Sequence, residues 1–155
     1  MIKNQAKVRR MYVDGPDGQI HLRIAIPTEH KGRPLFCFHL SPVSGIVYDN
    51  WIAEMGRDRL AVAPDTPGYG MSDPPREQPT IGTFADAMNA VMDKLDVNEA
   101  DIMGYHTGSK TCVELARQQP GRIKHLVLIS APIYTEEDLA KQNAEMGHST
   151  EPQED

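Results

Sequence analysis

The chain has 155 residues, of which 22 are acidic and 16 basic, and it carries a formal net charge of -6. This length suits one domain with its own core. The acidic balance disfavours binding to nucleic acid or to an anionic membrane. Because no apolar stretch approaches the ~20 residues that cross a bilayer and the first residues lack a signal peptide's apolar stretch, we expect a cytoplasmic protein.

The two cysteines, Cys37 and Cys112, fall in an apolar segment and in a helical pattern. Both are expected to be reduced packing residues rather than a disulfide. Neither lies beside a histidine in a motif, which disfavours a thiol nucleophile.

The first half of the chain contains short strand-like segments. Residues 7–13 and 19–26 are joined by a turn rich in glycine and aspartate, which predicts an antiparallel hairpin. The apolar residues 35–39 and 60–63 are typical of strands buried on both faces of a parallel sheet. Between them, residues 47–57 are predicted to be helical. The helically spaced apolar residues of that segment are Trp51, Ile52 and Met55.

The second half continues the alternation of helix and strand. Helices are expected over residues 80–95 and 107–119, and strands over 101–104 and 123–129. Strands that alternate with helices predict an α/β fold, with a mostly parallel, doubly wound sheet that follows the N-terminal hairpin. The inward residues are expected to be Phe84, Met88, Val91, Met92 and Leu95 in the first helix, and Val113, Leu115 and Ala116 in the second.

The chain divides into two parts by composition. Residues 1–133 contain the strands and helices of a core, whereas residues 134–155 begin with a helix-start pattern at Thr135 and end in a polar, acidic stretch. We expect the first part of this tail to form a lid-like helix and the last part to be disordered, because it lacks core residues.

Three segments carry recognisable motifs, and they occur in a consistent order. The first is the loop from Phe38 to Pro42 after a buried strand. The second is the glycine- and proline-rich loop from Asp65 to Pro74, and the third is Gly104-Tyr105-His106-Thr107-Gly108 between a strand and a helix.

Together these segments resemble the α/β-hydrolase superfamily, in particular its epoxide-hydrolase and esterase-like members, over roughly residues 8–132. The first is similar to the family's His-Gly-x-Pro oxyanion loop, with Leu40 in place of glycine. The second is similar to its Asp-x-Pro-Gly-x-Gly-x-Ser-Asp-x-Pro loop. The third resembles the Gly-x-Ser-x-Gly nucleophile elbow, with His106 in place of serine. The resemblance covers the N-terminal half of the family's fold and implies a truncated α/β-hydrolase.

The geometry of a nucleophile elbow explains why glycines flank its central residue. A strand that turns sharply into a helix strains the central residue and crowds its neighbours, so glycine is needed at positions such as Gly104 and Gly108. The amide of Thr107 then lies at a helix N-terminus and can stabilise an oxyanion, and the amide of Leu40 or Ser41 would complete the oxyanion hole.

His106 has three interpretations. It is a general base or nucleophile, a ligand-binding residue in a protein without chemistry, or a relic in a nonfunctional fragment. Serine hydrolysis in this fold also needs a later acid and histidine, which the resemblance places beyond residues 123–129. Ser109 lies one position too late to replace the elbow serine, and His148 lies in a polar tail with no strand before it.

His39 is expected near His106, since their strands are neighbours in the family's order. Its usual role in relatives is to hydrogen-bond the oxyanion loop. A metal site would need a third ligand, for which Asp65 is the convenient candidate, and we predict neither a metal nor a cofactor. The aromatic residues Trp51, Tyr48 and Tyr69 either line a pocket or pack between helix and loop.

The resemblance therefore implies a hydrolase acting on a small ester-like or carbonyl substrate, with His106 catalytic and with Leu40, Ser41, Thr107 and His39 around the oxyanion site. The alternative is a noncatalytic pseudo-hydrolase that binds a small molecule or a protein, or an inactive truncated fragment. The strand over residues 123–129 would also have an unpaired edge, where a homodimer partner or a complementing chain is expected.

Overall fold

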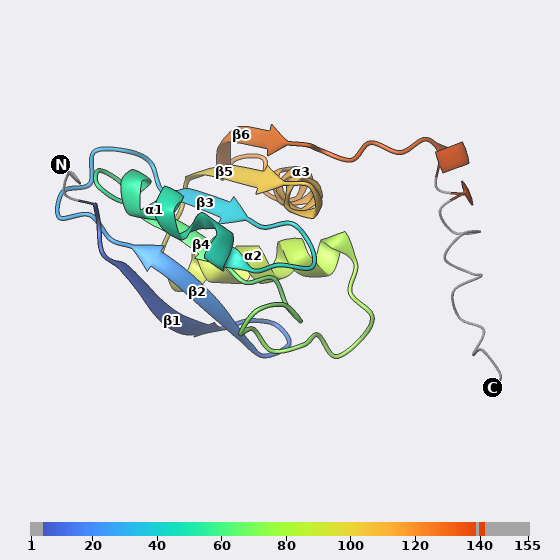
Figure 1. Cartoon of the computed structure of the whole chain (residues 1–155), viewed down its shortest axis with the longest axis horizontal. Helices are drawn as coiled ribbons and strands as arrows, with labels where there is room; N and C mark the ends of the chain where they lie inside the picture. Colours follow the sequence, from blue (N-terminus) through green and yellow to red (C-terminus); the bar gives the residue numbers. More distant parts are fainter. Residues whose placement is uncertain (1–4, 139, 142–155) are drawn as a thin grey trace.

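The computed structural model describes residues 5–138, 140 and 141. Six strands form one sheet in the order β1-β2-β4-β3-β5-β6, in which β1 and β2 run antiparallel and the other four strands run parallel to one another (Figure 1). This arrangement confirms the predicted mostly parallel α/β sheet with an N-terminal antiparallel hairpin. The strands are β1 (Val8–Asp14), β2 (Gln19–Ala25), β3 (Leu35–Phe38), β4 (Ala61–Pro64), β5 (Ala100–Tyr105) and β6 (Ile123–Ile129).

Helices cover both faces of the sheet (Figure 1). α1 lies on one face, and α2 and α3 lie on the other. Each face has its own hydrophobic cluster, because successive strand residues point in opposite directions: in β5, Ile102 packs with α2 and α3, whereas Met103 packs with α1. The helices are the 3-10 helix η1 (Gly45–Tyr48) and the α-helices α1 (Asp49–Met55), α2 (Ile81–Lys94) and α3 (Thr107–Gln118).

α2 begins at a capping box. The Thr80 hydroxyl accepts from the Thr83 amide, and the Thr83 hydroxyl accepts from the Thr80 amide, both at 3.1 Å. These bonds satisfy amides that the first helical turn leaves unpaired. The predicted inward face of this helix is confirmed: the side chains of Phe84, Met88, Val91 and Met92 are buried, and Leu95 packs against the same cluster.

The rotation of α3 differs from the sequence-based expectation. Val113 was expected to face the core of α3 but is 51% exposed, while Cys112 and Leu115 are fully buried. The stripe of α3 that faces the sheet is centred on Cys112 and Leu115, and a residue one position away points about 100° from that stripe. In the same way, Ile52 of α1 is buried and Trp51 is 46% exposed.

No helix in the described part of the chain is long and apolar enough to cross a membrane. After β6 the chain leaves the sheet, and residues 136–138, 140 and 141 are helical. The Thr135 hydroxyl accepts from the Asp138 amide at 3.2 Å, as in a helix N-cap. The tail that was predicted to be disordered, including His148, lies outside the described residues.

The two positions in α3 give a test of the core. Replacing Leu115 by alanine is expected to lower the free energy of unfolding by about 2–5 kcal/mol, because it opens a cavity under α3. The matched change Val113→Ala should alter it by no more than about 0.5 kcal/mol, because that side chain is half exposed. Urea unfolding followed by circular dichroism measures both. Equal effects at the two positions would show that α3 packs in another orientation.

Candidate functional site

The strand-to-helix turn after β5 has the geometry of a nucleophile elbow. His106 forms the N-cap of α3 with φ 51° and ψ -109°, a left-handed conformation that non-glycine residues rarely adopt. The two flanking glycines permit this turn. A side chain at Gly104 would overlap the backbone of Gly108, and a side chain at Gly108 would overlap the Phe38 carbonyl in the neighbouring strand.

Hydrogen bonds to β6 hold the elbow in place. The Ile129 carbonyl accepts from the His106 amide at 2.9 Å, and the Ser109 hydroxyl lies 3.1 Å from the same carbonyl. That hydroxyl also donates to the Gly104 carbonyl at 2.7 Å. Ser109 is fully buried and fastens the elbow from inside. The His106 imidazole is exposed at the carboxyl end of the parallel strands.

The residues predicted for an oxyanion hole meet at this turn. Among the described residues, the Thr107 amide has no hydrogen-bond acceptor, as expected in the first turn of a helix. The Ser41 amide points at the Thr107 hydroxyl, 3.5 Å away, and so faces the elbow from the loop after β3. The same hydroxyl lies 3.4 Å from Nδ1 of His106. The structure thus brings Ser41, Thr107 and His106 together, with Leu40 half-buried beside them.

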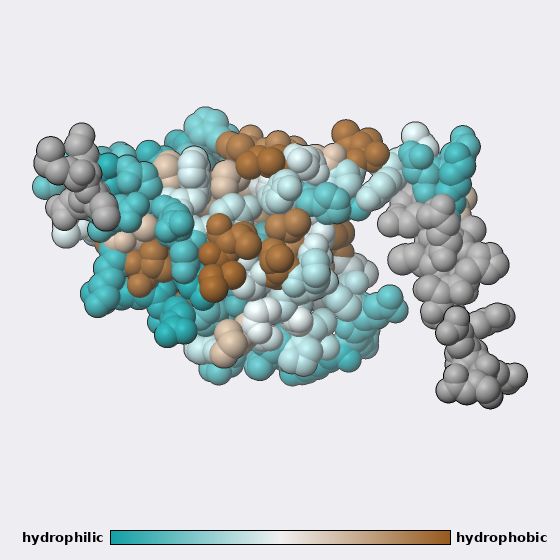
Figure 2. Space-filling model, viewed as in Figure 1, coloured by the Kyte–Doolittle hydropathy of each residue, from teal (hydrophilic) through white to brown (hydrophobic). Residues whose placement is uncertain are grey.

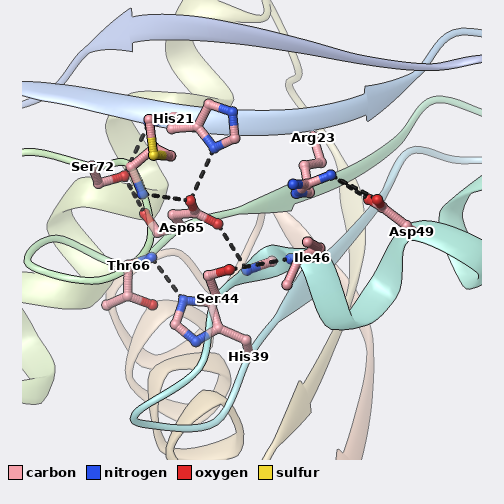
Figure 3. Close-up of polar contacts among 11 residues, drawn as sticks. His21, Arg23, His39, Ser44, Ile46, Asp49, Asp65, Thr66 and Ser72 are labelled. Carbon is pink, nitrogen blue, oxygen red and sulfur yellow. Dashed lines mark hydrogen bonds and ion pairs between the residues drawn. The ribbon is translucent and has the colours of Figure 1, made fainter.

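The His39 ring is hydrogen-bonded to backbone groups on both sides. The ring is buried, Nδ1 lies 2.8 Å from the Leu40 carbonyl, and Nε2 accepts from the Thr66 amide at 2.9 Å. Because the amide is a donor, Nε2 must be unprotonated and Nδ1 must carry the proton. Both nitrogens are therefore committed to backbone groups, Nδ1 to Leu40 in the loop after β3 and Nε2 to Thr66 in the loop after β4; Figure 3 shows the contact with Thr66. Burial lowers the pKa of His39, which keeps the ring neutral.

The buried carboxylate of Asp65 joins three parts of the chain (Figure 3). Oδ1 accepts from the Gly45 amide at 2.7 Å, and Oδ2 accepts from the Met71 amide at 2.9 Å. Oδ2 also lies 2.9 Å from Nδ1 of His21, which is buried as well. η1, the loop after β4 and the strand β2 are thereby tied to one side chain.

The loop after β4 is also fastened directly to β2. The Ser72 hydroxyl accepts from the His21 amide at 3.0 Å and donates to the Asp65 carbonyl at 2.7 Å. The Gln19 amide donates to the Asp73 carboxylate at 2.8 Å. Two glycines in this loop have positive φ, and a side chain at Gly70 would overlap the Asp65 carboxylate. The glycine- and proline-rich loop after β4 therefore folds around the carboxylate of Asp65. This structural role of Asp65 was not predicted from the sequence.

His106 has no activating partner in the described part of the chain. None of its carboxylates or other imidazoles is hydrogen-bonded to His106, and none of its residues form a group of three potential metal ligands. The carboxylate Asp65, considered above as a metal ligand, is occupied by amides and by His21. His148 is not among the described residues. The elbow thus combines an imidazole with backbone donors, without a carboxylate behind the imidazole.

The two cysteines and the aromatic residues Tyr48 and Tyr69 make contacts inside the fold. Cys37 and Cys112 are buried free thiols, and burial raises the pKa of Cys37 to about 12 and also raises that of Cys112, so neither is a ready nucleophile. The Tyr48 hydroxyl donates to the Phe38 carbonyl inside the fold. Tyr69 packs edge-on against both His39 and Phe84.

The fold and this elbow define the class of protein, and comparison with known families agrees. The family model described as alpha/beta hydrolase fold matches residues 45–150. The chain therefore belongs to the α/β-hydrolase family.

Known relatives are longer than this chain. It is 31% identical over 114 residues to 2-hydroxymuconate semialdehyde hydrolase of Pseudomonas sp. strain CF600, an alignment that covers 71% of this chain and 40% of the relative. It is also 31% identical over 111 residues to a non-heme chloroperoxidase of Streptomyces lividans. That alignment covers 69% of this chain and 40% of the relative. The chain thus spans less than half the length of these curated relatives.

Solved structures show the same fold. An epoxide hydrolase from Vigna radiata superposes with a TM-score of 0.77 at 22% identity, covering 90% of this chain and 46% of the other. A thermophilic esterase from Thermogutta terrifontis superposes with a TM-score of 0.72 at 20% identity. The superposition covers 94% of this chain and 55% of the esterase.

The role of Asp65 can be tested by Asp65→Asn. The amide group that replaces one oxygen would face amide donors, so we expect the free energy of unfolding to fall by about 3–5 kcal/mol, as when one partner of a buried charged network is removed. Urea unfolding measures the change. The control Glu54→Gln removes a carboxylate from an exposed ion pair with Arg57 and should have little effect. A wild-type stability in Asp65→Asn would show that the network does not hold the fold.

His39 makes the stability depend on pH. In the unfolded chain its imidazole binds a proton as the pH falls through about 6.5, whereas the folded chain binds it only at lower pH, because the folded pKa is lowered. The free energy of unfolding should therefore decrease as the pH falls below about 6.5, by at most about 1.4 kcal/mol per pH unit for one proton. Urea titrations from neutral to mildly acidic pH measure this slope.

The variant His39→Gln isolates the contribution of this ring, because it cannot titrate. It should be less stable at neutral pH but should show a smaller slope than the wild type between about pH 6.5 and 5. Identical slopes in the two proteins would assign the pH dependence to other groups.

Proposed function

We propose that this α/β-hydrolase family member hydrolyses a small ester or related carbonyl compound at the elbow, with His106 as the base or nucleophile. The observation that carries the proposal is the exposed His106 imidazole at the apex of the strained turn, directly before the free amide of Thr107. The hydrolase among the relatives named above supports this class of reaction, although its own substrate is not carried over to this chain.

The geometry suits His106 as a general base. If Nδ1–H donates to the Thr107 hydroxyl, Nε2 carries the lone pair of an exposed ring and can accept a proton from water. The water oxygen then adds to the carbonyl carbon, and the carbonyl oxygen becomes an oxyanion. When the tetrahedral intermediate collapses, the carbon–oxygen bond to the alcohol breaks and the imidazolium returns its proton to the departing alkoxide, so the ring ends as it began.

Backbone amides supply the second part of the chemistry. In this proposal the Thr107 amide, at the positive end of the α3 dipole, and the Ser41 amide, from the facing loop, bind the oxyanion. A substrate oxygen would replace the Thr107 hydroxyl as the acceptor for Ser41, whose present distance of 3.5 Å is long for a hydrogen bond. In other enzymes each such donor raises the reaction rate about 100- to 1000-fold, and a general base raises it about 100- to 10,000-fold.

A second candidate function is ligand binding without turnover. It is favoured by one observation: within residues 5–138 no carboxylate supports the His106 ring, so an imidazolium formed during the reaction would lack a counter-charge. In that case the same donors would bind a carbonyl or carboxylate group of a small molecule without cleaving it.

Hydrolysis of a panel of short-chain aryl esters distinguishes these functions. We expect slow turnover that falls at least about 100-fold in His106→Ala, because the base is lost while the backbone donors remain. The matched control His30→Ala removes an exposed histidine far along the chain from the elbow and should leave the rate unchanged. If no ester is hydrolysed, the proposal of catalysis fails. A ligand-induced rise in Tm without turnover then supports the binding function.

The variant His106→Ser is a further arm of the same experiment. It restores a hydroxyl at the apex but provides no group to activate it, so we expect negligible esterase activity. A large gain would reveal a base close to the elbow and would contradict the expectation that no residue of this chain activates a serine there.

A further inference from the structure

The hydroxyl of Thr107 lies between the imidazole of the elbow and the amide of the facing loop. Its Oγ1 is 3.4 Å from Nδ1 of His106 and 3.5 Å from the amide nitrogen of Ser41. The backbone amide of Thr107 itself has no acceptor among the described residues. One side-chain hydroxyl thus has an imidazole and two backbone amides close to it, which are the groups that a nucleophile of acyl transfer requires.

The donors and acceptors of this contact favour a hydroxyl that points at the imidazole. The Ser41 amide can only donate, so it takes one lone pair of Oγ1. In the described part of the chain, the hydroxyl hydrogen then has Nδ1 of His106 as its acceptor. In the other tautomer Oγ1 would accept from both neighbours, and its own hydrogen would have no acceptor among these residues. The fully paired arrangement places the lone pair of Nδ1 where it can take the hydroxyl proton.

The backbone fixes the positions from which the two side chains start. The His106 amide donates to the Ile129 carbonyl, and the His106 carbonyl accepts from the Ser109 amide, both at 2.9 Å. Thr107 is the first residue of α3, and its branched Cβ restricts the side chain to few rotamers in a helix. Because no helical turn precedes it, its hydroxyl has no helical carbonyl to bond instead. The turn itself therefore brings the imidazole and the hydroxyl together.

The other hydroxyls near the elbow are less suited to attack a substrate. Ser109 is fully buried, and its hydroxyl donates to the Gly104 carbonyl at 2.7 Å. The Ser41 side chain makes no hydrogen bond to His106 within the described residues, and its backbone amide is the group that faces the elbow. The Thr107 hydroxyl is half-buried and is the one that these residues place within reach of the imidazole.

We propose that Thr107 is the nucleophile of the hydrolysis proposed above and that Nδ1 of His106 is its base, so this role rests on that function. Oγ1 adds to the carbonyl carbon of the ester while its proton passes to Nδ1, and the carbonyl oxygen becomes an oxyanion. When this intermediate collapses, the bond to the alcohol breaks and the imidazolium returns the proton to the departing alkoxide. The acyl group is then esterified to Thr107.

A water molecule completes the cycle. It adds to the acyl carbon and gives a proton to His106, and the bond between that carbon and Oγ1 of Thr107 then breaks. The imidazolium returns the proton to Oγ1, so the hydroxyl and the ring end as they began. This route differs from direct attack by water in two respects. It passes through a covalent intermediate, and its basic nitrogen is Nδ1 rather than Nε2.

Diisopropyl fluorophosphate tests for the nucleophile without any need for turnover. An activated hydroxyl oxygen forms a bond to its phosphorus, fluoride leaves, and the hydroxyl proton passes to the base. The small apolar groups of this probe suit the surface, because Ile46 and Val47 are about half exposed and Figure 2 shows hydrophobic surface over η1. The full chain should gain one diisopropylphosphoryl group, and peptide mass spectrometry should locate it at Thr107.

Variants assign the label to this pair of side chains. Thr107→Val keeps the backbone amide and the shape of the side chain but lacks the hydroxyl, so it should not be labelled. His106→Ala should not be labelled either, because the base is lost, whereas Thr107→Ser keeps a hydroxyl and should recover the label. The matched control Thr28→Val makes the same change at an exposed position in the loop after β2 and should be labelled like the wild type.

Hydrolysis of the aryl esters gives a second measurement. Turnover should fall at least about 100-fold in Thr107→Val, and the initial burst of aryl alcohol that marks a covalent intermediate should disappear. Direct attack by water needs no hydroxyl at this position, so it predicts turnover without a burst in the wild type and little change in Thr107→Val. Thr28→Val should leave both the burst and the turnover unchanged.

The outcomes separate the role of Thr107 from the proposed function. Turnover that requires His106 but is unchanged in Thr107→Val, with no label at Thr107, would overturn this role and leave direct attack by water. A label at Ser41 or on the His106 ring would also overturn it. A label at Thr107 without ester turnover would support the nucleophile and contradict the proposed hydrolysis. A wild-type chain with neither label nor turnover would overturn both.

Discussion

The fold around the elbow depends on the buried carboxylate of Asp65. Three backbone or side-chain donors from separate segments converge on its two oxygens, and it is 1% exposed. A buried charge without such partners would destabilise the fold. Separating η1, the loop after β4 or β2 from the carboxylate would therefore cost free energy. His39 adds a second fastening between the loop after β3 and Thr66. The elbow is thus surrounded by loops whose backbone is fixed by buried polar groups.

The elbow itself is held by close backbone packing. Gly108 lies against the carbonyl of Phe38, and Gly104 lies against Gly108, so β3, β5 and α3 meet at distances that no side chain could tolerate. This packing fixes the direction of α3 whatever residue stands at the apex. The same turn can therefore present an imidazole as readily as a hydroxyl, so the residue at position 106 can differ without a change of fold.

The sequence predicted the architecture well because its signals are local. Buried apolar strands, a capping residue and the glycines of the elbow each act over a few positions, and all six strands lie within two residues of their expected bounds. The hydrogen bonds around the Asp65 carboxylate were not predicted. Its partners His21 and Gly45 are distant in the chain, and only the folded topology brings them together. The orientation of Val113 was wrong because a helix with few large apolar residues leaves its rotation undetermined. For His39, the bond of its ring to the Thr66 amide was not predicted, because Thr66 lies 27 positions further along the chain in another loop.

The carbonyl of Ile129 links the elbow to the strand β6. It is the last residue of the edge strand β6, and it accepts from the His106 amide while lying within hydrogen-bond distance of the Ser109 hydroxyl. The residue at the apex of the elbow is thereby bonded to β6, the last strand of the sheet in the described part of the chain. Ordering of β6 and occupation of the elbow are thermodynamically linked to the extent that each restrains Ile129. Such a linkage is reciprocal: whatever free energy a ligand at His106 contributes to the order of β6, a strand added to β6 returns to the ligand.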